Sequence, residues 1–164
     1  MTRFHLAQCN VARLVAPLDS PRLADFVAAL DPINARADAA PGFVWRFSEA
    51  TDVADSAVFD DDLLIVNMSV WESVDDLAAF VYRSDHVGVM RRRREWFERI
   101  EAYLVLWWIP AGTVPTPVDA RLRLDRLRQD GPTADAFTFR APFPPPDGGE
   151  QQPLAAVGEG QSPT

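Results

Sequence analysis

Residues 63–100 read LLIVNMSVWESVDDLAAFVYRSDHVGVMRRRREWFERI, and this stretch decides the fold of the chain. Its first nine residues alternate in character, as expected of a β-strand with two different faces. One face is continuously apolar, and the other is mixed and carries Ile65, Asn67, Ser69 and Trp71. Ser73 and Asp76 then have the spacing of a capping box, which predicts a helix directly after the strand. Beyond the polar break at residues 84–86, a second, arginine-rich helical pattern continues to Ile100.

Two strands and a helix are predicted before this stretch, and a strand and a helix after it. Residues 3–12 and 43–47 have strand patterns, whereas residues 20–39 form an amphipathic helix that begins with serine and proline. Residues 103–109, YLVLWWI, form a fourth strand that is apolar on both faces. A further capped helix is expected to begin at Thr116. The order is therefore β-α-β-β-α-β with an extra C-terminal helix.

This order predicts an α+β fold, a ferredoxin-like βαββαβ antiparallel sheet with helices on one face. The first and third strands are central neighbours in that topology. Their polar side chains should therefore form one cluster, which consists of Gln8, Asn10, Asn67 and Ser69. The alternation of the third strand suggests that this cluster lies on the sheet face opposite the helices. An uncovered sheet face would be a large apolar patch, so burial against a second copy predicts a homodimer, a dimeric α+β barrel.

Length and composition predict a single domain over residues 1–143, because 164 residues with 48% hydrophobic content suffice for one core. Residues 137–143 alternate aromatic and polar side chains and could lie extended against it. Residues 144–164 are rich in proline and glycine and are expected to be a disordered tail. The net charge of −8 argues against nucleic acid and acidic membrane surfaces as partners. A lone cysteine and the absence of a long apolar run predict a cytoplasmic protein.

All 16 basic residues are arginines, which excludes lysine Schiff-base chemistry and the P-loop lysine. The run Arg91–Arg94 spans about 300° of a helix and cannot face one ligand. Opposite charges four residues apart favour a solvated ion-pair surface there, and the pairs are Arg91 with Glu95, Arg94 with Glu98, and Glu95 with Arg99. Arg46 lies among aromatic residues, and either an internal carboxylate or an anionic substrate group would explain it.

Five separated blocks carry a family resemblance, namely LAQCNVARL, PGFVWRF, residues 59–97, YLVLWWIPAGTVPT and DGPTADAFTFRAPFPPP. Over residues 3–143 the chain resembles the bacterial family numbered 3291 among the domains of unknown function. The resemblance implies a dimeric α+β barrel related to antibiotic-biosynthesis monooxygenases. It implies no established reaction.

The wider superfamily suggests roles for individual residues. Its cofactor-free quinone-forming oxygenases and its haem-degrading oxygenases use an asparagine, a tryptophan and sometimes a histidine or arginine between helices and sheet. Asn67 and Trp71 resemble the asparagine and tryptophan of strand three, and Asn10 resembles the first-strand asparagine of the haem-degrading members. His86 resembles the histidine after the Trp-Glu segment, although its spacing departs from the haem-degrading branch. Such a cavity requires Asn67 to face the helices, contrary to the orientation suggested by alternation.

The candidate catalytic residues are therefore His86, Asn67 and Trp71. His86 would act as general base because the pKa of histidine is near neutral, or it caps a helix at the surface. Asn67 would donate to a carbonyl or enolate oxygen, or it bonds a protein neighbour. Trp71 would stack on a flat substrate, or it packs in the core. The candidate ligand-binding residues are Gln8, Asn10, Arg46 and Ser69.

No metal site is expected, because His5 is predicted on the opposite strand face from Gln8 and Asn10. No cofactor is expected either. The first functional hypothesis is a cofactor-independent oxygenase acting on a small aromatic or polyketide-like molecule through an enolate that reacts with dioxygen. One alternative is a non-catalytic ligand-binding or stress-related dimer that holds an apolar molecule. Another alternative is a haem-handling protein.

Overall fold

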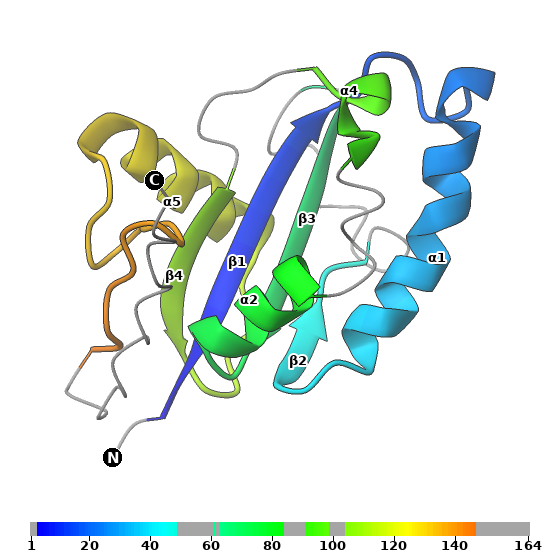
Figure 1. The fold of residues 1–164 in the computed structure, drawn as a ribbon. Helices are drawn as coiled ribbons and strands as arrows, with labels where there is room; N and C mark the ends of the chain where they lie inside the picture. Colours follow the sequence, from blue (N-terminus) through cyan, green and yellow to red (C-terminus); the bar gives the residue numbers. More distant parts are fainter. Residues whose placement is uncertain (1–2, 49–60, 62, 84–90, 99–103, 147–164) are drawn as a thin grey trace, which may run out of the picture.

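The structure is a computed structural model that describes residues 3–48, 61, 63–83, 91–98 and 104–146 (Figure 1). Its elements are β1 (Phe4–Arg13), the 3-10 helix η1 (Pro21–Leu23), α1 (Ala24–Asp38), β2 (Phe43–Arg46), β3 (Leu64–Trp71), α2 (Val74–Arg83), α4 (Arg93–Trp96), β4 (Leu104–Pro110) and α5 (Pro117–Asp130). This order confirms the predicted α+β arrangement with an additional C-terminal helix. None of the described helices is both long and apolar enough to cross a membrane.

The four strands form one antiparallel sheet in the order β2-β3-β1-β4, which is the ferredoxin-like order. Strand β1 is interior and pairs with β3 on one side and with β4 on the other. In the register of β1 with β3, Gln8 lies opposite Ser69 and Asn10 lies opposite Asn67. The prediction that the polar side chains of these two strands adjoin is therefore confirmed.

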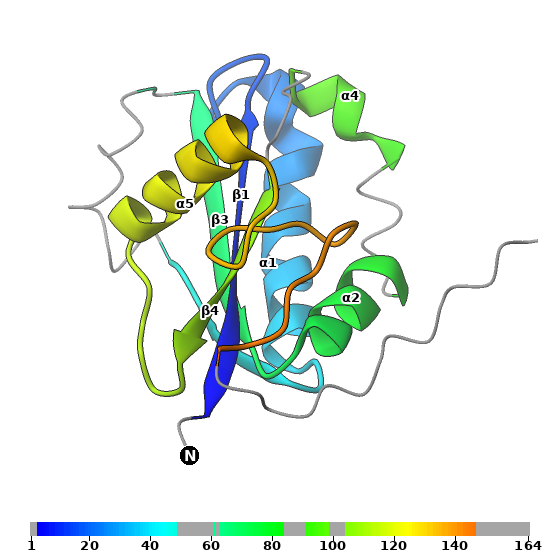
Figure 2. The same ribbon diagram turned by 90° about the vertical axis from the view of Figure 1, so that its left-hand side faces the viewer.

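The sheet carries helices on both faces, with α1, α2 and α4 on one side and α5 on the other (Figure 2). We call these the α1/α2 face and the α5 face. Trp71 packs against Leu77 of α2, and Ile65 packs in the cluster that contains Phe26 of α1. Asn67 and Ser69 lie between Ile65 and Trp71 at intervals of two residues, so their side chains point to the same face of β3. The polar cluster therefore lies on the α1/α2 face. The predicted face was wrong, because alternation separates two strand faces without showing which helices cover each.

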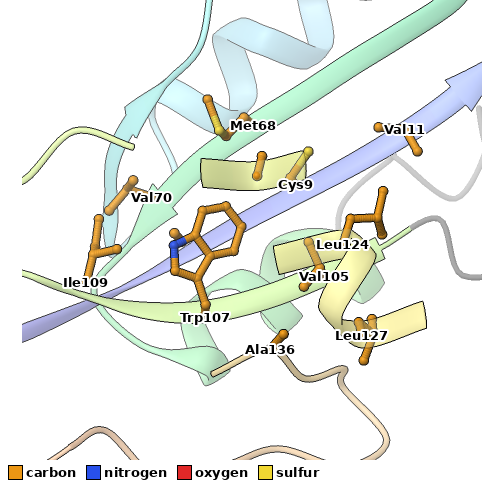
Figure 3. Close-up of a cluster of buried hydrophobic side chains, with 12 residues drawn as sticks. Cys9, Val11, Met68, Val70, Val105, Trp107, Ile109, Leu124, Leu127 and Ala136 are labelled. Carbon is orange, nitrogen blue, oxygen red and sulfur yellow. The ribbon is translucent and has the colours of Figure 1, made fainter. Parts of the chain in front are cut away.

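The sheet face opposite the polar rows is largely apolar, and α5 packs against its core (Figure 3). The buried side chains of this core are Ala7, Cys9, Val11, Met68, Val70, Val105, Trp107, Ile109, Ala120, Leu124, Leu127 and Ala136. Helix α5 begins as predicted, because the N-cap Thr116 and Asp119 in the first turn form a capping box and Pro117 is the first residue of the helix. The face from which the homodimer was argued is therefore covered within one chain. The homodimer itself stays a prediction.

Residues 131–146, the C-terminal strap, continue from α5 around the edge of β4 (Figure 2). Phe137 and Leu106 exchange two backbone hydrogen bonds of 2.8 and 2.9 Å, and Phe137 is fully buried. Trp108 Nε1 donates to the carbonyl oxygen of Phe143 at 2.8 Å. The prediction that residues 137–143 lie against the domain is confirmed, but they are not extended throughout, because a turn at residues 139–140 interrupts them. The strap also covers backbone groups that an edge strand would otherwise expose.

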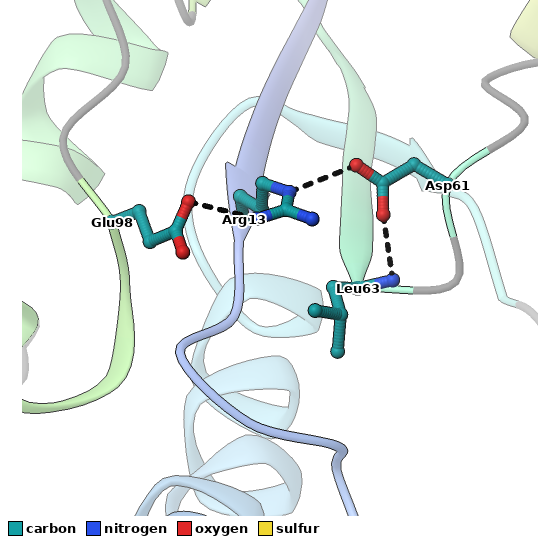
Figure 4. Close-up of polar contacts among 4 residues, drawn as sticks. All are labelled: Arg13, Asp61, Leu63 and Glu98. Atoms are coloured by element: carbon teal, nitrogen blue, oxygen red, sulfur yellow. Dashed lines mark hydrogen bonds and ion pairs between the residues drawn. The ribbon is translucent and has the colours of Figure 1, made fainter.

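Arg13 connects three chain segments at one end of the sheet (Figure 4). Its guanidinium donates to Asp61 at 3.0 Å and to Glu98 at 2.9 Å, while Asp61 also accepts the backbone N–H of Leu63 at 2.9 Å. The hydrogen bond from Arg13 lowers the pKa of Asp61, and that from Leu63 lowers it further. The hydrogen bonds that Arg13 donates to Asp61 and then to Glu98 raise the pKa of Arg13. Because these side chains are partly exposed, their contribution to stability is small.

Arg92, which belongs to none of the predicted pairs, forms ion pairs, whereas Arg99 of the predicted Glu95–Arg99 pair lies outside the described residues. Arg92 contacts Asp25 at 2.9 Å and Glu95 at 2.8 Å, and its guanidinium lies 4.8 Å from the centre of the Trp96 ring. Hydrogen bonds to Glu95 and then to Asp25 raise the pKa of Arg92. Glu98 pairs with Arg13 instead of Arg94, because α4 ends at Trp96 and the next residue is extended. A partly exposed ion-pair surface is thus confirmed at Arg92.

The packing of α5 predicts very different costs for two leucine truncations on the same helix. Leu124 is 1% exposed and Leu122 is 62% exposed. Leu124→Ala should lower the free energy of unfolding by about 2–5 kcal/mol, because it leaves a cavity beneath the helix. Leu122→Ala, the matched control, should change it by less than about 0.5 kcal/mol. Urea unfolding followed by tryptophan fluorescence measures both, and equal costs would contradict this packing.

Gly42 in the turn before β2 should tolerate alanine less well than Gly112. Both have positive φ angles, 79° and 88°, but the Asp76 carboxyl occupies the space where a Cβ on Gly42 would lie, whereas the space at Gly112 is open. Gly112→Ala should cost on the order of 1 kcal/mol. Gly42→Ala should cost roughly 1–3 kcal/mol more, because the capping carboxylate must move. Thermal unfolding of the two variants measures this difference in cost. Equal costs would mean that Asp76 does not pack on this turn.

Candidate functional site

The polar side chains of β1 and β3 lie in two adjacent rows on the α1/α2 face. Gln8 and Ser69 form one row, and Asn10 and Asn67 form the next. Trp71 lies two residues beyond Ser69 on the same strand face. Because β1 and β3 are both interior strands, these rows occupy the middle of the sheet rather than an edge.

A continuous chain of hydrogen bonds links four of these side chains, and we call it the polar chain (Trp71, Ser69, Gln8 and Asn67). Trp71 Nε1 donates to Ser69 Oγ at 2.9 Å. Gln8 Nε2 donates to Ser69 Oγ at 2.9 Å and to Asn67 Oδ1 at 2.7 Å. Trp71, Gln8 and Ser69 are only 1%, 4% and 8% exposed. The indole N–H of Trp71 and both amide hydrogens of Gln8 therefore have hydrogen-bond acceptors although these side chains are buried.

The polar chain ends at an exposed amide. Asn67 is exposed, and the neighbouring Asn10 is half-buried. The Asn67 carbonyl oxygen is occupied by Gln8, but within the described residues its Nδ2 makes no side-chain hydrogen bond, and neither does the side chain of Asn10. The two side-by-side amides, which we call the asparagine pair, thus offer free N–H groups on the helix-covered side of the sheet.

Two hydrophobic clusters flank the polar rows along the strands. The one beside Gln8 and Ser69 contains Leu6, Trp71, Leu77, Leu106 and Phe137. The other, beyond the asparagine pair, contains Leu14, Leu23, Phe26 and Trp96, with Ile65 packed against it. Helix α2 belongs to the first cluster, whereas α1 and α4 belong to the second. The exposed amide of Asn67 therefore lies between two separately packed apolar regions.

Trp71 supports the polar chain from its buried end. Its ring stacks on Phe80 with centroids 5.3 Å apart and meets the edge of Phe43 at 5.5 Å. Together with its burial, these contacts leave the ring without an open face in this conformation. Its direct contribution to the site is the indole N–H, which holds Ser69 in place.

Arg46 lies beside Ser69 in the register of β2 with β3. Its guanidinium donates to both carboxylate oxygens of Asp38, at 2.7 and 3.3 Å. Of the two explanations that the sequence left open, the structure shows the internal carboxylate. Asp38 was not predicted as this partner, because helix α1 must first pack beside β2 to bring the two side chains together.

The remaining candidates divide by position. His86 lies outside the described residues, so its role stays a prediction. His5 lies on the α5 face, opposite Gln8 and Asn10 as expected, and the part of the chain that the structure describes holds no group of three possible metal ligands. Cys9 also faces α5, and burial raises the pKa of its thiol to about 12. It is therefore protonated at neutral pH and separated from the asparagine pair by the sheet.

Asn34 is a site candidate that the sequence reasoning missed. Helical spacing places it on the stripe of α1 that contains Leu30 and the buried Ala37, and it is half-buried. The available signal was a polar residue within an apolar helical stripe, the same signal that identified Asn67 in its strand.

Comparison with known proteins gives one family and several similar solved structures, two of which are those of SnoaB and NE2512. A family model described as "Domain of unknown function (DUF3291)" matches residues 5–153, and no curated protein matches the chain. SnoaB from Streptomyces nogalater, a cofactor-independent oxygenase, is 18% identical with a TM-score of 0.42, covering 67% of this chain and 95% of SnoaB. NE2512 from Nitrosomonas europaea, a protein of unknown function, is 14% identical with a TM-score of 0.45, covering 71% of this chain and 98% of NE2512. These likenesses assign no activity to the chain.

The polar chain predicts a coupling between Ser69 and Trp71. Ser69→Ala leaves the buried indole N–H and one Gln8 hydrogen unpaired, so it should lower the free energy of unfolding by about 1–3 kcal/mol. Trp71→Phe removes the indole donor, and in that background the cost of Ser69→Ala should be smaller. A double-mutant cycle by urea unfolding measures this difference. Strictly additive costs would mean that the Trp71–Ser69 hydrogen bond contributes nothing.

Proposed function

This chain belongs to the DUF3291 family, and we propose that it binds a small apolar or aromatic molecule whose oxygen accepts hydrogen bonds from Asn10 and Asn67. One observation carries the proposal. In the middle of an interior strand, on a face that helices cover, Asn67 is exposed with its carbonyl engaged, and its N–H groups have no side-chain partner among the described residues. Because Asn67 is exposed, water can occupy these donors, and a ligand oxygen that displaces this water would accept the same hydrogen bonds.

The surroundings suit an apolar body attached to that oxygen. Leu104 is the strand neighbour of Asn10, and Ile65 precedes Asn67 on the same strand face. Both side chains are only partly buried. A flat hydrocarbon framework that contacts them would gain about 25 cal/mol for each Å² of apolar surface removed from water. Each amide hydrogen bond would add about 0.5–1.5 kcal/mol, or about 1.5–3 kcal/mol if the oxygen is anionic.

Charge at the site favours a neutral or delocalised oxygen over a phosphate or other compact anion. The nearest predicted cation, Arg46, is held by both oxygens of Asp38. A compact anion would have to compete with that carboxylate, and the chain carries a net charge of −8. A ketone, or a phenolate or enolate whose charge is spread over a ring, needs only N–H donors. This is the class of ligand that the asparagine pair supports.

The same donors support a catalytic version of this function, in which the chain is a cofactor-independent oxygenase. Removal of a proton from a substrate methylene, with His86 as base, would give an enolate that the asparagine pair stabilises as charge develops on its oxygen. Reaction with dioxygen would convert the methylene to a carbonyl. One oxygen atom enters the product, and the other leaves as water with the two methylene hydrogens, so the substrate is oxidised and dioxygen is reduced.

Fluorenone, a flat tricyclic ketone, tests the binding site. We expect Asn67→Ala to weaken fluorenone binding about tenfold, equivalent to one lost hydrogen bond of about 1.4 kcal/mol. Fluorene, which has the same rings without oxygen, should bind both proteins equally. Gln129→Ala removes an exposed amide on α5 and serves as the control. Titration calorimetry measures the binding of both ligands to all three proteins, and equal fluorenone affinity for wild type and Asn67→Ala would refute the site.

Oxygen uptake with anthrone separates the catalytic version from simple binding. A catalytic protein should consume one dioxygen for each anthrone converted to the quinone, and His86→Ala should slow this conversion while fluorenone still binds. Fluorenone binding without oxygen uptake would instead favour the non-catalytic alternative. A Soret shift on addition of haemin would favour the haem-handling alternative, and its absence would argue against it.

A further inference from the structure

We infer that Gln8 is a positioning residue that sets the orientation of the Asn67 amide and thereby selects ligands that accept hydrogen bonds over ligands that donate them. This inference deepens the proposed binding function and rests on it. It concerns a residue that need not touch the ligand, because Gln8 is buried one row away from the asparagine pair.

Gln8 has both hydrogens of its amide nitrogen committed. One goes to Ser69 Oγ at 2.9 Å and the other to Asn67 Oδ1 at 2.7 Å. On its other side Gln8 neighbours Leu106 of β4, whose side chain has no polar atom. The described structure therefore holds the Gln8 nitrogen toward β3, where both of its acceptors lie.

The direction of these hydrogen bonds begins at Trp71. An indole N–H can only donate, so Ser69 Oγ must accept from it at 2.9 Å. The same oxygen accepts from Gln8 with its second lone pair, and the remaining Gln8 hydrogen reaches the Asn67 carbonyl. If the Asn67 amide alone turned over, its N–H groups would face those of Gln8, and buried donors would lack acceptors. If the Gln8 amide turned over with it, both Gln8 hydrogens would lose Ser69 and Asn67 and point toward the side of Leu106, which offers no side-chain acceptor. The arrangement therefore holds the Asn67 carbonyl inward and its nitrogen outward.

Selectivity follows from this fixed orientation. A free asparagine amide can donate or accept by rotating, and so it does not distinguish a ketone from an amine. With Gln8 in place, Asn67 presents only N–H groups to its exposed side. A ligand with a ketone, phenolate or enolate oxygen finds donors there, whereas a ligand whose only polar group is N–H faces another donor.

Three flat tricyclic probes of similar size measure this selectivity: fluorenone accepts a hydrogen bond, carbazole donates one through N–H, and fluorene does neither. Wild type should bind fluorenone about tenfold more tightly than carbazole. Gln8→Glu supplies a carboxylate that accepts from Asn67 and turns its carbonyl outward. At pH 8.5 this variant should reverse the preference, with fluorene affinity unchanged.

Two further variants control the comparison. Gln8→Met retains the volume but neither hydrogen bond, so Asn67 can rotate and the ratio of fluorenone to carbazole affinity should fall toward one. Gln129→Glu makes the same chemical change as Gln8→Glu on the exposed surface of α5 and should leave the ratio at its wild-type value. Near-ultraviolet circular dichroism verifies that each variant is folded.

Hydrogen exchange of side-chain amides, followed by NMR on the wild-type protein, tests the positioning without a ligand. The Gln8 amide hydrogens should exchange much more slowly than those of Gln129, and the Asn67 hydrogens should exchange fast. Equal rates for the two glutamines would overturn the inference. An unchanged probe ratio in folded Gln8→Glu would overturn it while the binding function stands. Failure of wild type to bind fluorenone would overturn the proposed function itself, whatever the exchange rates show.

Discussion

The antiparallel pairing of β1 with β3 is the constraint on which the rest of this structure depends. The register that joins Gln8 to Ser69 also joins Asn10 to Asn67, and it separates both rows from the apolar residues between them. Because side chains alternate with a period of two, a slip of one residue on one strand would turn that strand's polar residues toward the α5 core. The apolar content of the α5 face therefore enforces the register that assembles the polar chain.

The two faces of the sheet are stabilised in different ways. The α5 face is largely apolar, with His5 as an exception on β1, and a single capped helix of the same chain packs against its core. The α1/α2 face is divided, with a hydrophobic cluster at each end and amide and hydroxyl groups between them. A polar row in that position does not contribute to apolar packing, and polar atoms removed from water need hydrogen-bond partners. At its buried end the polar chain supplies these hydrogen-bond partners. At its exposed end, the N–H groups of Asn67 have no side-chain partner among the described residues.

A ligand site on such a face gains from the rigidity of its surroundings. Trp71 is packed between Phe43 and Phe80, so the first donor of the polar chain is held by aromatic contacts from β2 and α2. The orientation of the exposed Asn67 amide then depends on the hydrogen bonds of the polar chain and requires no movement of the backbone. Sites built on interior strands are positioned more accurately than sites on loops. This is the physical advantage of placing the asparagine pair in the middle of the sheet.

The sequence by itself determined the order of elements, the strand neighbours, the capped start of α5 and the clustering of Gln8, Asn67 and Ser69, because periodicity, caps and topology are local or nearly local signals. Only the tertiary structure decided which helices cover each sheet face, that α5 buries the apolar one, and that Arg46 pairs with Asp38. It also decided that the Trp71 ring is buried and that Glu98 forms an ion pair with Arg13. These outcomes depend on how separate elements pack against one another, and alternation within a strand distinguishes its two faces without naming what will cover them.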